Sequence, residues 1–455
     1  MFFFSKESVI RYVLIFAGIA CCSMSATAGV FSLQQSVAMA LQHNRLLAAD
    51  QYRVRAAETR VGEANGHFLP RLDADYSVMR SNSPLTVFGT KLMQERVAAA
   101  DFNPSTLNNP SAINNYRPSL TLTMPLYQGG ALWAGRKQAE QGALASSRQY
   151  LWLRQQLIFQ TIQTYMALLN ADAQLKAAEK SLEASSRNLD NIKAMRKRGL
   201  LIDSDVMDAR VRRLQNEVRV NQSRNGVAHA RDLLARLTGM TIGTMLHPAA
   251  GPKLRAPAPA GRAGIERLEK VAIEQRPDLQ AMQSDLEASR AAVDMEKATF
   301  MPHVSLQASQ QWNSSTPSVR NGNATLAAMV SMNLFAGGSD HAALNRRRAN
   351  VARLSLELDD KRQQVVNQVR QALRQLREAQ QRQKAESEAM RQSRESLRIS
   401  EIRYAQGLKK TSDLLAAQSR TDLARAEAIR AGYDVSVARA NLLLVSGNLS
   451  EESLQ

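Results

Sequence analysis

Few residues of this 455-residue chain have the types and the spacing that chemistry requires. The two cysteines, Cys21 and Cys22, are adjacent near the N-terminus, and the six histidines are scattered, so no metal-ligand spacing is present. Residues 130–137 are superficially similar to a phosphate-binding loop, but Arg136 replaces the required Lys and Lys137 the required Ser or Thr. We therefore predict that the protein is not an enzyme and uses no metal and no cofactor.

Charged and tyrosyl side chains gather instead in two short clusters, where they could form ion pairs and hydrogen bonds. The clusters surround two Gly-Leu pairs, Gly199-Leu200 and Gly407-Leu408. Capping of two helical hairpins explains a glycine at the end of one helix and Ser, Thr or Asp at the start of the next. Capping does not require four of the nearby side chains, which remain candidates for function: Asp205, Tyr404, Lys409 and Asp413.

Both clusters belong to an internal repeat, because Leu126-Tyr127-Gln128-Gly129-Gly130 recurs 208 residues later as Leu334-Phe335-Ala336-Gly337-Gly338. A fixed long period means that one structural unit is used twice. Each copy has the order helix, two strands, very long helix, tight turn, helix. After residues 1–28, we assign 29–239 to the first copy, 240–262 to a Pro-rich linker, 263–447 to the second copy and 448–455 to a C-terminal tail.

Two segments in each copy alternate apolar and polar residues, and we predict strands at about 70–80, 116–126, 302–312 and 324–335. Strands of about ten residues with one apolar and one polar face suit a lipid-facing, water-lined barrel, although a half-buried hairpin gives the same pattern. Four strands cannot close a barrel, and eight leave an interior filled by side chains. Three chains would therefore form the smallest ring with an open lumen.

The connection between the two strands is 24 residues longer in the first copy than in the second. Its Asn-Pro and Asp-rich clusters are typical of turns and loops. Outer-membrane barrels have their longer loops on the outside, so we predict that this loop lies outside the cell and partly caps the pore.

Helical periodicity extends over 131–198 and 339–406, and each helix would be about 100 Å long at 1.5 Å per residue. Apolar residues at heptad spacing predict coiled-coil packing of these helices. Shorter helices are predicted at 31–67, 205–237, 261–300 and 413–445. In each copy, two short helices together match the length of one long helix. We therefore expect them to stack end to end beside it.

The N-terminus predicts export. Lys6 and Arg11 precede an apolar run, and small residues end at Ala28, which is the pattern of a secretory signal cleaved after Ala28. The run of about eleven apolar residues is shorter than the roughly 20 that a spanning helix needs. We assign 1–28 to a signal peptide, with lipidation of Cys21 as the alternative.

The chain carries a formal net charge of +18, which raises nucleic-acid binding as an alternative function. The arginines are spread along polar helix faces, however, and an exported protein rarely meets nucleic acid. We therefore predict a solvated basic surface and no nucleic-acid partner.

The tandem repeat, the Phe-Leu-Pro and Phe-Met-Pro strand entries, the Gly-Gly strand exits and the two Gly-Leu…Asp turns resemble the TolC-like outer-membrane efflux protein family. The resemblance covers essentially the whole mature chain. It implies a mixed α/β membrane protein, with a trimeric twelve-stranded outer-membrane β-barrel (four strands per protomer) continuous with a long α-helical coiled-coil periplasmic tunnel. The implied location is the outer membrane of a Gram-negative bacterium, extending into the periplasm.

The resemblance also implies a passive channel of a tripartite efflux or secretion system. Its implied partners are the other subunits of a homotrimer, a periplasmic adaptor (membrane fusion protein), an inner-membrane transporter of RND or ABC type, and outer-membrane lipid. A soluble periplasmic coiled-coil adaptor or scaffold is the alternative, which would tuck its strands into a soluble domain.

In this family the tips of the helical hairpins close the tunnel. By motif position, Asp205 would bond to Tyr404 and Lys409, although the family has Arg where this chain has Lys409, which loosens the ion pair. Asp413 matches one carboxylate of an acidic constriction, whereas Ala416 stands at the companion position. Family adaptors grip the tips, which correspond here to Gly199, Leu200, Gly407 and Leu408.

Overall fold

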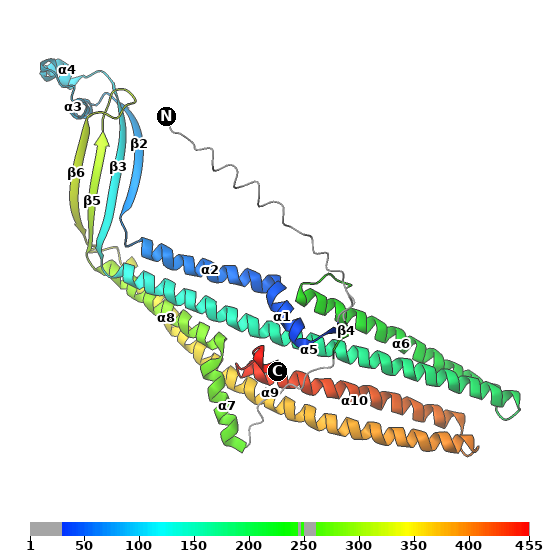
Figure 1. The fold of residues 1–455 in the computed structure, drawn as a ribbon. Helices are drawn as coiled ribbons and strands as arrows, with labels where there is room; N and C mark the ends of the chain where they lie inside the picture. The colour runs from blue at the N-terminus through cyan, green and yellow to red at the C-terminus, as the bar shows by residue number, and fades with distance from the viewer. Residues whose placement is uncertain (1–29, 244–246, 250–260, 455) are drawn as a thin grey trace, which may run out of the picture.

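Figure 1 shows the computed structural model of the chain, which describes residues 30–243, 247–249 and 261–454. The predicted signal peptide and most of the predicted linker lie outside the described residues. The described part is elongated, with a small sheet at one end and long helices that run away from it (Figure 1). None of the helices among these residues combines the length and the apolar character needed to cross a membrane.

Both copies of the repeat have the same order of main elements. The first copy contains β1 (Val30–Phe31), α1 (Leu33–His43), α2 (Arg45–Gly66), β2 (Arg71–Ser81), α3 (Pro84–Met93), a 3₁₀ turn (Ala99–Phe102), α4 (Pro104–Asn108), β3 (Ile113–Gln128), α5 (Ala131–Lys197) and α6 (Asp203–Thr238). After β4 (His247–Pro248), the second contains α7 (Gly261–Gln275), α8 (Pro277–Lys297), β5 (His303–Trp312), β6 (Gly322–Ser331), α9 (Ser339–Ala405) and α10 (Thr411–Val445).

The other helices pack around two long helices, α5 and α9, which have 67 residues each. Helices α1, α2 and α6 lie along α5, with α2 on the half nearer the sheet and α6 on the farther half (Figure 1). Helices α7, α8 and α10 line α9 in the same way. Helices α8 and α10 also pack against α5, which joins the two copies into one wall.

The helices predicted as continuous over 31–67 and 261–300 are each broken, so this prediction was wrong. Asn44 ends α1, and its side-chain oxygen accepts hydrogen bonds from the backbone of Leu46 (3.0 Å) and Leu47 (3.1 Å), which caps α2. In the second copy, Pro277 begins α8 and holds Arg276 in an extended conformation. We call these breaks the first elbow (Asn44) and the second elbow (Arg276).

The four long strands form one antiparallel sheet in the order β2-β3-β5-β6. Their apolar residues share one face, because Leu72 lies opposite Leu122 and Leu122 opposite Ala308. This face is exposed within the chain, where Val330 on β6 is 70% exposed. The sheet is therefore not the half-buried hairpin pair of an ordinary soluble domain, and within the described part of the chain the outer sides of β2 and β6 pair with no further strand.

The long connection between β2 and β3, predicted as a loop, contains α3, a 3₁₀ turn and α4. Gln94 follows α3 and is buried; its amide donates to the side chain of Asn115 (2.9 Å), whose own amide donates to Asn313 (2.9 Å). These bonds tie the connection to both hairpins at the end of the sheet far from the long helices (Figure 1).

Each copy has its own apolar core midway along the helices. The first joins α1, α5, α6 and α10 around residues such as Ile162 and Leu234, and the second joins α7, α8, α9 and α10 around residues such as Val369 and Leu442. The hydroxyl of Tyr165 donates to the carbonyls of Phe31 (2.8 Å) and Ala249 (3.0 Å). The described end of the linker therefore lies against the middle of α5.

Candidate functional site: the helical tips

The first tip joins α5 to α6 at the end of the molecule far from the sheet (Figure 1). Gly199 has a φ of +75°, a conformation that suits glycine, and Leu200 N–H donates back to the Met195 carbonyl (3.1 Å). Arg196 forms an ion pair with Asp203 across the turn (2.7 Å). Asp205 Oδ2 accepts from the Ile202 N–H (3.3 Å), so this carboxylate caps its own helix.

The second tip joins α9 to α10 with the same backbone design. Gly407 has a φ of +74°, and Leu408 N–H donates to the Arg403 carbonyl (2.9 Å). Lys409 donates to the hydroxyl of Ser400 on α9 (2.7 Å). Asp413 lies exposed in the first turn of α10, where a negative charge is favourable.

Of the four predicted gate residues, Tyr404 is the one that reaches the other tip within the chain. Its ring packs against an apolar cluster of the first tip that includes Ile192 and Ala209. Its hydroxyl lies 3.4 Å from the hydroxyl of Thr411. Among the described contacts, no hydrogen bond joins Asp205 to Tyr404 or Lys409. The chain alone thus brings the two tips together but does not assemble the polar contact that the resemblance implies.

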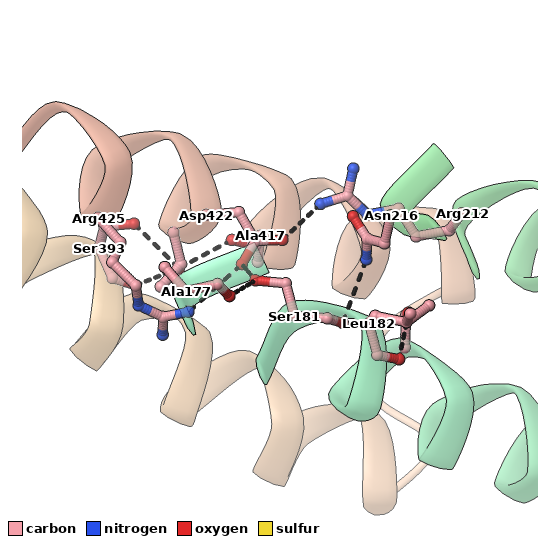
Figure 2. A network of polar contacts seen from close by, with 11 residues as sticks. Ala177, Ser181, Leu182, Arg212, Asn216, Ser393, Ala417, Asp422 and Arg425 are labelled. Carbon is pink, nitrogen blue, oxygen red and sulfur yellow. Dashed lines mark hydrogen bonds and ion pairs between the residues drawn. The ribbon is translucent and has the colours of Figure 1, made fainter. Parts of the chain in front are cut away.

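A polar network above the tips connects the two copies and was not predicted (Figure 2). Asp422 on α10 accepts from Arg212 on α6 (2.7 Å) and from the hydroxyl of Ser181 on α5 (2.6 Å). Arg425 lies 3.6 Å from the same carboxylate, and Asn216 donates to the Ser181 carbonyl (3.2 Å). The side chains of Arg212 and Asp422 are only about a tenth exposed, so this ion pair is largely withdrawn from water.

We call these five residues the hairpin network. Nothing in the local sequence around Asp422 distinguishes it from the many solvated charges on the same helices, and its partner Arg212 lies 210 residues earlier. Comparison of the two copies is the sequence signal that could have found Asp422. Arg212 of the first copy has a basic counterpart, Arg420, in the second, whereas Asp422 of the second copy has an apolar counterpart, Leu214, in the first.

The described residues contain no group of three or more His, Cys, Asp or Glu side chains placed to hold a metal ion. The candidate site therefore consists of the two tips and the hairpin network behind them. Their geometry suits a part of the molecule that changes conformation, because a small number of polar contacts connects the packed hairpins there.

The sequence profile of a family described as "Outer membrane efflux protein" matches residues 37–240 and 268–448, which are most of both copies. The chain belongs to the outer membrane efflux protein family. The predicted family resemblance is thereby confirmed, and the assignment supports a channel rather than the soluble adaptor alternative.

This efflux protein is similar to two curated relatives over most of its length. It is 24% identical over 391 residues to the alkaline protease secretion protein AprF of Pseudomonas aeruginosa, covering 85% of this chain and 78% of AprF. It is 25% identical over 435 residues to the protein CyaE of Bordetella pertussis, covering 93% of this chain and 85% of CyaE.

The fold of this efflux protein is that of CusC, a protein of known structure that forms a transmembrane channel. The crystal structure of CusC superposes with a TM-score of 0.78 at 18% sequence identity, covering 91% of this chain and 92% of CusC. The predicted fold class is confirmed, with one four-stranded sheet per chain. The efflux protein is located in the outer membrane of a Gram-negative bacterium and extends into the periplasm.

Proposed function

We propose that three copies of this efflux protein form one outer-membrane duct, whose periplasmic end is closed by the helical tips. The observation that carries the proposal is the sheet. It exposes an apolar face, and among the described residues each of its two edge strands is paired on one side only. Because neighbouring strands alternate in direction, β6 of one copy would run antiparallel to β2 of the next, so the sheet can continue from copy to copy.

Twelve strands from three copies would enclose an open lumen, with the apolar face toward outer-membrane lipid. The helices would continue this cylinder into the periplasm for about 100 Å, because α5 and α9 have 67 residues each. The connection of α3 and α4 would lie outside the cell and partly cap the pore. Such a duct conducts its cargo, drugs or other molecules, passively.

The proposed gate consists of Asp205, Tyr404, Lys409 and Asp413. Tyr404 already packs against the first tip, Lys409 lies in the turn of the second tip, and Asp205 and Asp413 lie in the first turns of α6 and α10. An exposed polar contact between tips stabilises the closed state by only about 0–1 kcal/mol. Three such contacts around a ring, acting together, would hold the gate closed and still allow a partner to open it.

The partner that opens it would be a periplasmic adaptor that grips the tips. Leu200 and Leu408 are 64% and 71% exposed at the far end of the molecule, next to Gly199 and Gly407, and supply apolar contact sites. An inner-membrane transporter of RND or ABC type, held by the adaptor, would supply the energy and select the cargo.

The duct is tested by light scattering of the purified mature protein in detergent and by conductance in planar bilayers. We expect a species of three chains that passes ions across the bilayer. A single-chain species without conductance would overturn the proposal.

The gate is tested separately with Asp205→Ala combined with Tyr404→Phe, which we expect to raise the resting conductance. The matched control is Asp203→Ala, which removes a carboxylate of the same tip that is engaged by Arg196 rather than by the second tip. Equal conductance of the double variant and the control would refute the gate assignment and leave the duct standing.

A further inference from the structure

The second elbow is filled by side chains from several helices. Arg276 is only 1% exposed, and its guanidinium donates to both carboxylate oxygens of Asp278 (2.9 and 2.7 Å) and to Gln368 on α9 (2.6 Å). Trp152 of α5 lies over the same guanidinium, with 4.7 Å between the guanidinium carbon and the ring centroid. A tryptophan face is a favourable neighbour for a buried cation.

A hydrogen bond next to this elbow also comes from α5. The amide of Gln155 donates to the carbonyl of Gly447, just after α10 (3.1 Å). Trp152 and Gln155 belong to the first copy of the repeat, whereas Arg276 and Gly447 belong to the second. The second elbow is therefore completed by the long helix of the other copy.

The first elbow has the same backbone but is open. A cavity of about 540 Å³ lies beside Asn44, and its lining includes Arg45, Leu46, Arg236 and Gly239. Leu46 is 74% exposed. Gly239 is the repeat equivalent of Gly447, but no hydrogen bond to its carbonyl is made from the described residues. At the second elbow, α5 of the first copy of the repeat fills the equivalent space. Comparison of the two elbows indicates that the first elbow lacks the equivalent helix, α9, from another chain.

The residues that would fill it are present on α9. The sequence Arg154-Gln155-Gln156 of α5 recurs 208 residues later as Arg362-Gln363-Gln364. Gln363 is thus the repeat equivalent of Gln155, and Asp360 is that of Trp152. Both are exposed on α9, so another chain can reach them; Asp360 also accepts a hydrogen bond from Gln364 one turn further along the same helix (2.7 Å).

We propose that the open first elbow receives α9 of a second copy of this chain, an inference that rests on the homotrimer proposed above. Gln363 of the partner subunit donates to the carbonyl of Gly239. Asp360 of the partner subunit lies between Arg45 and Arg236, which line the cavity. A carboxylate between two guanidinium groups takes the place of the tryptophan–arginine contact at the second elbow.

An apolar stripe on α6 continues the same face toward the tips. Met207, Val211, Leu214 and Val218 are all exposed and follow heptad spacing. The repeat equivalents of Leu214 and Val218 are Asp422 and Ala426, which contact α5 through Ser181 and Gln174. If the repeat equivalents pack alike, Leu214 and Val218 face the long helix α9 of another chain. The elbow and the stripe thus form one continuous docking face.

Cross-linking tests the placement. In a background where the mature chain has no cysteine, we combine Leu46→Cys with Asp360→Cys and treat the detergent-solubilised protein with a short bismaleimide. We expect covalent dimers and trimers on denaturing gels. The matched control replaces Asp359 instead, giving Leu46→Cys with Asp359→Cys, because residue 359 is rotated by about 100° from residue 360 around the same helix and should give little product.

Charge reversal tests the recognition. Asp360→Arg should weaken assembly roughly tenfold or more, measured by light scattering across a dilution series, because three like charges then meet. Asp359→Arg should leave assembly unchanged, and Arg45→Asp with Arg236→Asp should restore the Asp360→Arg variant. If wild-type protein forms trimers but the cross-link is absent, or Asp360→Arg assembles normally, the docking face is wrong and the duct stands. A monomeric wild type would overturn both.

Discussion

The boundary between the two copies inside the chain and the open face of the first copy use different chemistry at equivalent positions. Inside the chain, Asp422 is held by Arg212 and Ser181 in a largely buried ion pair. On the open face the equivalent position is Leu214, which is followed by Val218.

The difference has a physical reason. Two copies joined in one chain need little extra association energy, so their boundary can hold a buried ion pair that fixes geometry but adds little net stability. Separate chains have to associate, and burial of apolar surface supplies that driving force. We therefore expect the in-chain boundary to fix the relative position of the two copies of the repeat, and the open face to determine the affinity between separate chains.

The largest expected effect comes from the elbows. Arg276→Ala removes the positive charge and hydrogen bonds that balance the carboxylate of Asp278, and it also removes the hydrogen bond to Gln368. It should therefore lower the free energy of unfolding by about 3–5 kcal/mol. Asn44→Ala at the first elbow removes only a helix cap and should cost about 0.5–2 kcal/mol. Denaturation of both variants in detergent compares them, and equal losses would show that the elbows do not differ.

The next effect concerns the hairpin network. Asp422→Asn removes the charge that Arg212 and Ser181 engage, and should weaken the in-chain boundary by about 1.5–3 kcal/mol and raise the resting conductance. The control is Glu427→Gln, which affects an exposed ion pair between the same helix, α10, and Arg382 on α9. A conductance that rises equally in both variants would contradict a special role for the buried pair.

A pH dependence distinguishes the second elbow from the first. Burial raises the pKa of Asp278, but the hydrogen bonds and charges of Arg276 and Lys361 outweigh this effect and hold the pKa below its ordinary value of 3.8. The unfolded state therefore binds the proton first as pH falls, and the stabilisation by Asp278 is lost as pH falls through the lowered pKa.

We accordingly expect Asp278→Asn to lower the free energy of unfolding by roughly 1–2 kcal/mol above about pH 5. The difference from wild type should shrink below about pH 4. Denaturant titrations at several pH values measure it, and a difference that grows toward acid pH would contradict the assignment.

The smallest effect separates the two equivalent glutamines. Gln155→Ala removes the in-chain hydrogen bond to Gly447 and should lower the free energy of unfolding of the chain by about 1 kcal/mol. Gln363→Ala should leave the chain's own stability unchanged and weaken only assembly, by about the same amount. Dilution experiments and denaturation of each variant are sufficient, and identical profiles for both would remove the basis for distinguishing the faces.

The sequence alone was sufficient for the fold class and the family. The signals were alternation in four segments, heptad spacing in two helices and the 208-residue offset. These signals are local or periodic, so they can be recognised without knowing which segments pack together. The glycines of the tips were identifiable for the same reason, since Gly199 and Gly407 both adopt a positive φ that few other residues tolerate.

Other local features were missed although their signals were present. The elbows depend on Asn44 and on the Arg276–Pro277 pair, each of which is a recognised stop inside an otherwise helical pattern. The short helices α3 and α4 both begin with proline at their first position, which is a helix start as well as a loop signal.

Tertiary structure decided which of the many charged residues matter. Arg212 and Asp422, or Arg276 and Trp152, look like any other members of their helices until packing brings them together across more than a hundred residues. Periodicity specifies which face of a helix is apolar but not which helix lies against it. The pairing of copies inside the chain, and the face left open for another chain, follow only from how the two groups of shorter helices pack around α5 and α9.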